Sequence, residues 1–321
     1  MFKNHKLMLL WLALMLSFSL LFMAGCGGQE EATEQPGENT QQEAPKVDSA
    51  QVVKDAADKY FAKMPEHIYK ISEDDTKALL DSGELADYLV VDIRDAETYA
   101  KGHIQGAINV PYKEIGKNLD LIATNAKGKK GVFVVCFTGQ TAGQTTAALN
   151  MLGIPTRSIN LGMKLGWEAK GYPVVADVTE ASPAEAIDWA DKAPIKEAVE
   201  NYFEKMPSGM YDSYKIGLDE LKAELEASPE KYVIVDVRGH EEYAKGTIKG
   251  AIDVPFKEVN QHFDEIAELA KGKTVVVACF TGQTAGQTDT VLNLIGIKTV
   301  SLHRGINAGW VEEKGFELTQ Q

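Results

Sequence analysis

The ten-residue stretch CFTGQTAGQT occurs twice in the chain, at residues 136–145 and 279–288. Each copy carries one cysteine, Cys136 or Cys279. Apart from a phenylalanine, the residues that follow are small or neutral, so the chain can curl and turn successive backbone N–H groups toward the sulfur. Such a loop stabilises a thiolate, which is the nucleophilic form of cysteine. The stretch therefore predicts a reactive thiol in each half of the chain.

The loop after each cysteine is the candidate binding site for an anionic sulfur. Its backbone amides and the N-terminus of the following helix supply partial positive charge, while the Thr and Gln side chains add hydrogen bonds or cap the helix. The candidate residues are Phe137, Thr138, Gly139, Gln140 and Thr141 in the first loop, and Phe280, Thr281, Gly282, Gln283 and Thr284 in the second. We expect no metal site, because neither loop has Cys or His at ligand spacing.

Two other interpretations of the cysteines stay open. Each cysteine can be a small buried hydrophobic residue at a strand end, or the two can form a disulfide between the halves of the chain. The identity of ten residues across a loop favours a reactive thiol over a buried hydrophobic residue. Loops usually tolerate sequence changes, and the flanking strands GVFVV and TVVVA differ between the two copies.

Short apolar runs and longer helical stretches alternate around these loops. YLVVDI and YVIVDV, and then GVFVVC and TVVVAC, are typical of strands buried on both faces of a parallel sheet. AGQTTAALNMLG and AGQTDTVLNLIG have helical spacing and are expected to end at Gly153 and Gly296. We therefore predict an α/β fold with a mostly parallel sheet flanked by helices, and with the cysteine at the carboxyl edge of the sheet, where ligands bind.

The chain is a tandem duplication. The two cysteines are separated by the same number of residues as Trp167 and Trp310, and the stretch that begins at Tyr88 returns at Tyr232. A period this long indicates two domains of common size rather than a solenoid. We place the first domain at residues 51–176, a polar linker at 177–194 and the second domain at 195–321.

The N-terminal residues indicate export. Lys3 and Lys6 precede an apolar run at 7–24 that ends in LFMAGC, which resembles a bacterial lipoprotein signal. The resemblance implies a signal peptide at 1–25, lipidation of Cys26, and a protein anchored in the membrane on the extracytoplasmic face of a bacterial cell. An uncleaved transmembrane anchor is the alternative. Residues 26–50 are rich in Gln, Glu, Gly and Pro and are expected to form a flexible tether.

The net charge of −14 argues against nucleic acid as a partner. The same acidity disfavours an anionic membrane surface as a binding partner of the folded part.

Both halves resemble rhodanese domains. The resemblance rests on VVDIRDAETYAKGHIQGAINVP and its second copy, on the C-x-x-G-x-T loop, and on the terminal G…W…GYP, and it covers nearly all of residues 52–321. It implies two tandem rhodanese-like domains in which a sulfane sulfur passes through a persulfide on Cys136 or Cys279, with no cofactor beyond this covalent intermediate. The partners implied are a small sulfur donor (thiosulfate, a persulfide or a polysulfide) and a thiol or cyanide acceptor. Asp92 with Arg94, and Asp236 with Arg238, match the D-x-R pair of the family.

We interpret the D-x-R pairs as buried ion pairs that support the strand end. Because the loops carry no cation and the protein is acidic, we expect thiosulfate, a dianion, to be a poorer donor than a persulfide or polysulfide. A phosphatase is disfavoured, because Ala142 and Ala285 stand where a Cys-x5-Arg loop has its arginine. A non-enzymatic binding or redox-sensing module at the cell surface is the remaining alternative.

Overall fold

The computed structural model describes residues 48–207 and 213–320 of the 321-residue chain. The predicted signal peptide, Cys26 and all but the last three residues of the predicted tether lie outside these ranges. Residues 49 and 50, which we expected in the tether, already belong to helix α1, and Asp48 caps that helix by accepting hydrogen bonds from two backbone N–H groups. In the part of the chain that the structure describes, no helix is both long and apolar enough to cross a membrane.

Each repeat contains five strands and five α-helices among the described residues. The strands of the first repeat are β1 (Lys70–Ile71), β2 (Leu89–Asp92), β3 (Ile108–Asn109), β4 (Val132–Val135) and β5 (Thr156–Ile159). Its helices are α1 (Ser49–Ala62), α2 (Glu73–Ser82), α3 (Ala96–Lys101), α4 (Leu119–Ala126) and α5 (Gln140–Met151), and a π-helical turn, Gly162–Trp167, follows β5.

The second repeat has the same order of elements. Its strands are β6 (Lys215–Ile216), β7 (Tyr232–Asp236), β8 (Ile252–Asp253), β9 (Thr274–Ala278) and β10 (Thr299–Leu302). Its helices are α6 (Ala193–Glu204), α7 (Leu218–Ala227), α8 (His240–Lys245), α9 (Phe263–Leu269) and α10 (Gln283–Leu294), and a π-helical turn, Gly305–Glu313, follows β10.

The two sheets have equivalent topologies. Their strand orders are β1-β5-β4-β2-β3 and β6-β10-β9-β7-β8, and every pair of neighbouring strands is parallel. Helices α5 and α10 connect neighbouring parallel strands as crossovers. They end before Gly153 and Gly296, both of which adopt positive φ angles, as predicted from the sequence. The prediction of an α/β fold with parallel sheets flanked by helices is confirmed.

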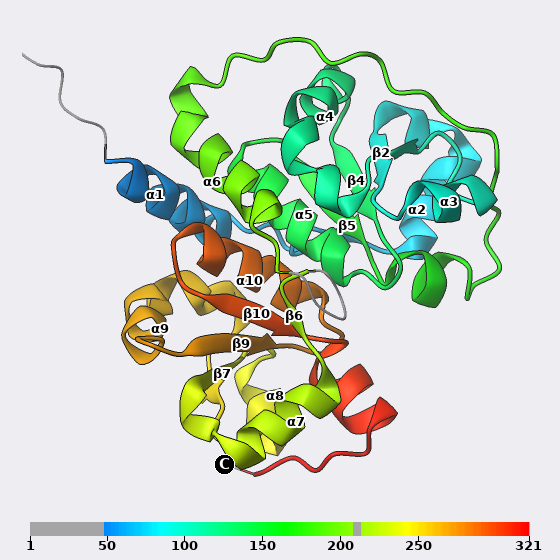
Figure 1. Ribbon diagram of the computed structural model, residues 1–321. Helices are drawn as coiled ribbons and strands as arrows, with labels where there is room; N and C mark the ends of the chain where they lie inside the picture. Colours follow the sequence, from blue (N-terminus) through cyan, green and yellow to red (C-terminus); the bar gives the residue numbers. More distant parts are fainter. Residues whose placement is uncertain (1–47, 208–212, 321) are drawn as a thin grey trace, which may run out of the picture. The chain divides into compact units, whose positions relative to one another are not determined.

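The two faces of each sheet pack into different cores. One face carries a core that belongs to its own repeat, around Phe133 and Trp167 in the first and around Trp310 in the second. The other faces contribute to one continuous core that contains buried residues of both repeats. Figure 1 shows this layering for the second repeat, with α10 on one side of β9 and β10 and with α7 and α8 on the other.

The leading helix of each repeat packs against the other repeat. In α1, the ring of Phe61 lies edge-on to Phe256 and Phe263 at centroid distances of 5.7 and 5.9 Å. In α6, Phe203 makes the equivalent contact with Tyr112, at 5.5 Å. The repeated aromatic pairs at the start of each repeat are core residues, as expected, but the core they fill is the one that both repeats share.

Candidate active site

Cys136 and Cys279 lie at the carboxyl ends of the central strands β4 and β9, one residue beyond each strand. Both are free thiols, and their residues are only 2% and 1% exposed. The backbone N–H groups of Gly139 and Ala142 point at Cys136 Sγ, with N···S distances of 3.1 and 3.3 Å. The N–H of Gly282 lies 3.1 Å from Cys279 Sγ. Cys136 Sγ therefore accepts two backbone N–H groups of its own repeat and Cys279 Sγ accepts one, and the two cysteines are not joined in a disulfide.

The loop curls because one glycine in it takes a conformation that other residues avoid. Gly139 and Gly282 have φ angles of +93° and +90° and directly precede α5 and α10. The curl is held from outside by the π-helical turn of the same repeat, where the N–H of Met163 donates to the carbonyl of Cys136 over 2.7 Å. The sulfur thus lies at the N-terminus of a twelve-residue helix, where the partial charge favours an anion.

The D-x-R residues form a buried ion pair beside each loop. Arg94 binds Asp92 through Nε and Nη2, the latter at 2.7 Å, and Nη2 also donates to the carbonyl of Gly102. Arg238 binds Asp236 in the same way, at 2.7 Å, and donates to Gly246. Because both oxygens of each carboxylate are engaged, the pair fixes the end of β2 or β7 next to the cysteine-bearing strand.

Each arginine also lies over the aromatic residue of the loop. The guanidinium carbons of Arg94 and Arg238 are 5.8 and 5.9 Å from the ring centroids of Phe137 and Phe280. These phenylalanines are 44% and 43% exposed, whereas the cysteines beside them are buried. A molecule that approaches the sulfur therefore meets an apolar ring supported by a cation.

The glutamines of the repeated stretch bind the opposite repeat. Gln140 Nε2 donates to Ser301 Oγ over 2.9 Å and to the carbonyl of Leu302. Gln283 Nε2 donates to Ser158 Oγ over 2.7 Å. Neither helix has a side-chain cap, and the hydrogen bonds that these amide groups donate go to the other repeat rather than to their own loop. Their backbones still belong to the loops.

The threonines of the loops are less buried than the glutamines. Thr138, Thr141 and Thr281 are half-buried, and Thr284 is 8% exposed. The roles in sulfur binding that we assigned to these residues stay predictions.

A lysine from each repeat, which we did not predict as a site residue, has a charge interaction with the cysteine of the other repeat. Burial lowers the pKa of Lys215 below its usual value, while its charge interaction with Cys136 raises that pKa. Lys70 stands in the same relation to Cys279. The loops themselves carry no cation, and these lysines come from the opposite repeat. A signal was present, since Tyr69-Lys70-Ile71 returns as Tyr214-Lys215-Ile216.

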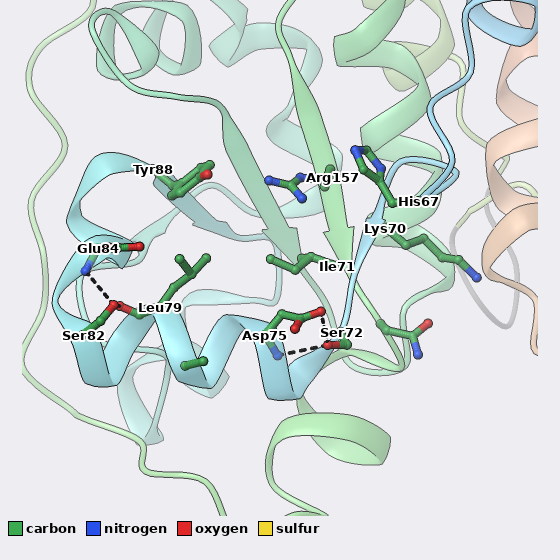
Figure 2. A pocket seen from close by; sticks show the side chains of 12 residues that line it. His67, Lys70, Ile71, Ser72, Asp75, Leu79, Ser82, Glu84, Tyr88 and Arg157 are labelled. Atoms are coloured by element: carbon green, nitrogen blue, oxygen red, sulfur yellow. Dashed lines mark hydrogen bonds between the residues drawn. The ribbon is translucent and has the colours of Figure 1, made fainter.

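A cavity of about 750 Å³ lies beside α2 in the first repeat, and neither cysteine lines it. Figure 2 shows Tyr88, Arg157 and His67 along one side of it, with Asp75 and Ser72 opposite. The amine of Lys70 extends away from the other labelled side chains. The cavity is thus separate from the sulfur sites, although Lys70 borders it.

The profile of the rhodanese-like domain family matches residues 72–170 and 217–313, which together make up more than half of the chain. The chain belongs to the rhodanese family. Each matched segment includes one cysteine with its loop and one D-x-R pair, so each repeat is a rhodanese-like domain.

Two curated relatives are sulfurtransferases. The chain is 39% identical over 64 residues to the thiosulfate sulfurtransferase PspE of Escherichia coli, which is 20% of this chain and 59% of that protein. It is 35% identical over 85 residues to a tRNA sulfurtransferase of Pyrobaculum aerophilum, which is 26% of this chain and 17% of that protein. The matches thus span less than two thirds of either relative. They support a sulfurtransferase-type function for the rhodanese domains.

The solved structures that resemble the chain include a thiosulfate sulfurtransferase from Pseudomonas aeruginosa. It is 20% identical, the match covers 85% of this chain and 48% of that one, and the TM-score is 0.34. A rhodanese-like domain protein from Staphylococcus aureus is 29% identical over 33% of this chain and 97% of that one, with a TM-score of 0.29.

Proposed function

We propose that both rhodanese domains are active sulfurtransferases that carry a sulfane sulfur as a persulfide on Cys136 and Cys279. The observation that supports this most strongly is the backbone N–H of the loop glycine at each sulfur, with Gly139 and Gly282 both at an N···S distance of 3.1 Å. These donors and the helix N-terminus stabilise negative charge on a thiolate, and they suit the terminal sulfur of a persulfide equally well.

The reaction has two displacement steps. The cysteine thiolate attacks the outer sulfur of the donor, a bond forms between Sγ and that sulfur, and the donor leaves with the electron pair of its broken bond, as sulfite from thiosulfate or as a thiolate from a persulfide. An acceptor thiolate or cyanide then attacks the terminal sulfur. The Sγ–S bond breaks, its electron pair returns to the cysteine, and the cycle closes without net oxidation of the protein.

The donor is a small sulfane compound, and the structure changes our ranking of the candidates. We expected thiosulfate to bind poorly because the loops carry no cation. The charges of Lys70 and Lys215 interact with Cys279 and Cys136, and Arg94 and Arg238 lie beside the loops. A dianionic donor therefore has positive charge within reach, and thiosulfate is a candidate on the same footing as a persulfide or polysulfide.

Steady-state kinetics test the proposal. With thiosulfate or polysulfide as donor and cyanide as acceptor, the wild-type protein should give parallel double-reciprocal plots, which are the signature of a substituted-enzyme cycle. Cys136→Ser and Cys279→Ser should each retain part of the activity, and the double variant should retain none. Equal activity in the wild type and the double variant would reject the proposal. Complete loss in one single variant would restrict it to one domain.

We also propose that Cys26 is lipidated and holds the two domains at the extracytoplasmic face of the membrane. The support for this is the sequence LFMAGC after the apolar run. Metabolic labelling with a clickable fatty acid should mark the wild-type protein and leave Cys26→Ser unlabelled. Equal labelling of both proteins would contradict this assignment.

A further inference from the structure

Lys70 and Lys215 occupy corresponding positions in the short strands β1 and β6. The next residue in each strand, Ile71 or Ile216, packs into the core on the outer face of its own sheet. Because successive side chains of a strand point to opposite faces, each lysine points to the other face, where α5 or α10 covers the sheet. This is the face on which the two domains meet.

The strand register places Lys215 beside the cysteine loop of the first domain. Lys215 pairs with Ser301 on β10, and Ser301 Oγ accepts the hydrogen bond from Gln140 Nε2 over 2.9 Å. Gln140 begins α5 and follows Cys136 by four residues. The N–H of Arg304 also donates to Gln140, at 3.3 Å. The carboxyl edge of the second sheet is thus attached to the first loop.

The reciprocal contact places Lys70 beside the loop of the second domain. Lys70 pairs with Ser158 on β5, and Ser158 Oγ accepts from Gln283 Nε2 over 2.7 Å. Gln283 begins α10 and follows Cys279 by four residues. The same arrangement therefore occurs twice.

The charges around the two lysines differ. Lys215 interacts with Cys136, with Asp289 on α10 and with His303, whereas Lys70 interacts with Cys279. Thr146 stands in the first domain where the second has Asp289, and Asn160 stands where it has His303. Lys215, the lysine that interacts with Cys136, is therefore also attracted by the carboxylate of Asp289. Lys70, the lysine that interacts with Cys279, has a threonine at the position equivalent to Asp289.

We propose that each active site is completed in trans, with Lys215 stabilising the anionic sulfur on Cys136 and Lys70 stabilising that on Cys279. For the persulfide this inference rests on the proposed function, and for the thiolate it stands alone. An ammonium group in a partly buried site acts more strongly than it does in water, and it adds a charge to a loop that otherwise supplies only amide dipoles. The two domains then depend on each other for reactivity as well as for packing.

The test is alkylation of single-cysteine proteins with iodoacetamide over a range of pH. It uses the full chain with Cys26→Ser, so that in a Cys279→Ser background Cys136 is the reacting thiol. Lys215→Met should lower the alkylation rate at pH 7 about tenfold and move the midpoint of the pH profile up by about one unit, because the thiolate loses the cation assigned to it. Lys70→Met should change this rate far less. In the Cys136→Ser background the two effects should be exchanged.

Two further variants keep the result interpretable. Lys231, an exposed residue in the second domain, is the matched control, and Lys231→Met should leave both rates within about twofold. Lys215→Arg keeps the charge and should restore most of the rate that Lys215→Met loses. If Lys215→Met does not fold, Lys215→Gln with the same Arg variant gives the comparison.

The proposal predicts a crossed pattern, in which each lysine variant slows the alkylation of the cysteine in the other domain. If each lysine variant affects the cysteine of its own domain more, if both affect the two cysteines equally, or if neither moves the pH profile, the inference is overturned. Alkylation requires no sulfur donor. A protein that shows the crossed pattern but forms no persulfide would therefore contradict the proposed function and leave the lysine assignment intact.

Discussion

Gly286 lies against the backbone of Gln140, so close that a Cβ atom added to the glycine would come within 2.6 Å of the Gln140 carbonyl oxygen. Gly143 meets Gln283 in the same way from the other domain. Because these contacts join α10 to α5, glycine is required at both positions for the helices to approach. The repeated stretch therefore has two functions, since it surrounds the sulfur with backbone N–H groups and also forms contacts between the two domains.

Gly286→Ala should destabilise the protein by about 1–3 kcal/mol, because the neighbouring atom belongs to the backbone of Gln140 and the helices must separate to make room. Urea unfolding followed by circular dichroism measures the change. Gly239→Ala is the matched control, since nothing lies within 4 Å of its added Cβ and its φ of −151° suits any residue. A cost for Gly286→Ala no larger than that of the control would show that the interface is looser than the contact implies.

Phe61→Ala should reduce the free energy of unfolding by about 3–5 kcal/mol, the usual range for removing a buried phenylalanine. Phe61 is only 2% exposed and contacts two phenylalanines of the second domain. Chemical denaturation of the full chain tests this, with Val178→Ala, at a site 64% exposed, as a control expected to cost less than about 0.5 kcal/mol. If fluorescence and circular dichroism then report separate unfolding transitions for the two domains, the packing of α1 against the second domain does not couple their unfolding.

Asp92→Asn should cost about 3–5 kcal/mol, because it removes the buried counter-charge of Arg94 and leaves only the half-exposed Glu168, at 3.7 Å. Glu97→Gln breaks an exposed pair with Lys101 and should cost under about 0.5 kcal/mol. Thermal unfolding at matched pH compares the two. Below the unfolding transition, Asp92→Asn should alkylate at Cys136 within about fourfold of the wild-type rate. A stable Asp92→Asn protein with an unreactive thiol would instead assign the pair a direct role in the chemistry.

Unfolding should depend on pH through His303. Burial, and then the charge of Lys215, lower the pKa of His303 to about 4, while Glu313 opposes and Arg304 reinforces the shift. Between pH 6.5 and 4 the unfolded state therefore binds more protons than the folded state. The stability that His303 contributes is fully present above pH 6.5 and is lost as the pH falls through about 4.

His303→Asn introduces the residue found at the equivalent position 160. It should flatten the pH dependence of unfolding in this window, by less than the single-proton limit of about 1.4 kcal/mol per pH unit because the ring is partly exposed. Urea titrations at several pH values measure it. His262→Asn, which removes an imidazole paired with Glu265 on the protein surface, is the control. Identical slopes for His303→Asn and the wild type would contradict the assignment.

Much of each domain could be predicted from local patterns. The strands at β2, β4, β7 and β9 were evident as apolar runs that are buried on both faces, and the glycines after α5 and α10 marked the ends of those helices. The cysteine loops were predicted from their repetition and composition. These features depend on neighbours in sequence, so one sequence was sufficient.

The contacts between the domains could not be predicted in this way. Nothing in the segment around Phe61 says which core it fills, because an amphipathic helix packs equally well on its own sheet or on a duplicated copy. Gln140 and Gln283 were assigned to their own loops for the same reason. Lys70 and Lys215 lie in strands of two residues, too short to show a periodic pattern, so their approach to the cysteines depends on the tertiary arrangement alone.

Intact-mass spectrometry of the reduced, folded protein after treatment with polysulfide or thiosulfate tests the central claim most directly. Each of Cys136 and Cys279 should gain the mass of one sulfur atom, fragment spectra should place the added sulfur on these two residues, and cyanide or a thiol should remove it. The double variant Cys136→Ser with Cys279→Ser should gain none. A wild-type protein that takes up no sulfur from any of these donors would contradict the sulfurtransferase assignment and favour a binding role for the two domains.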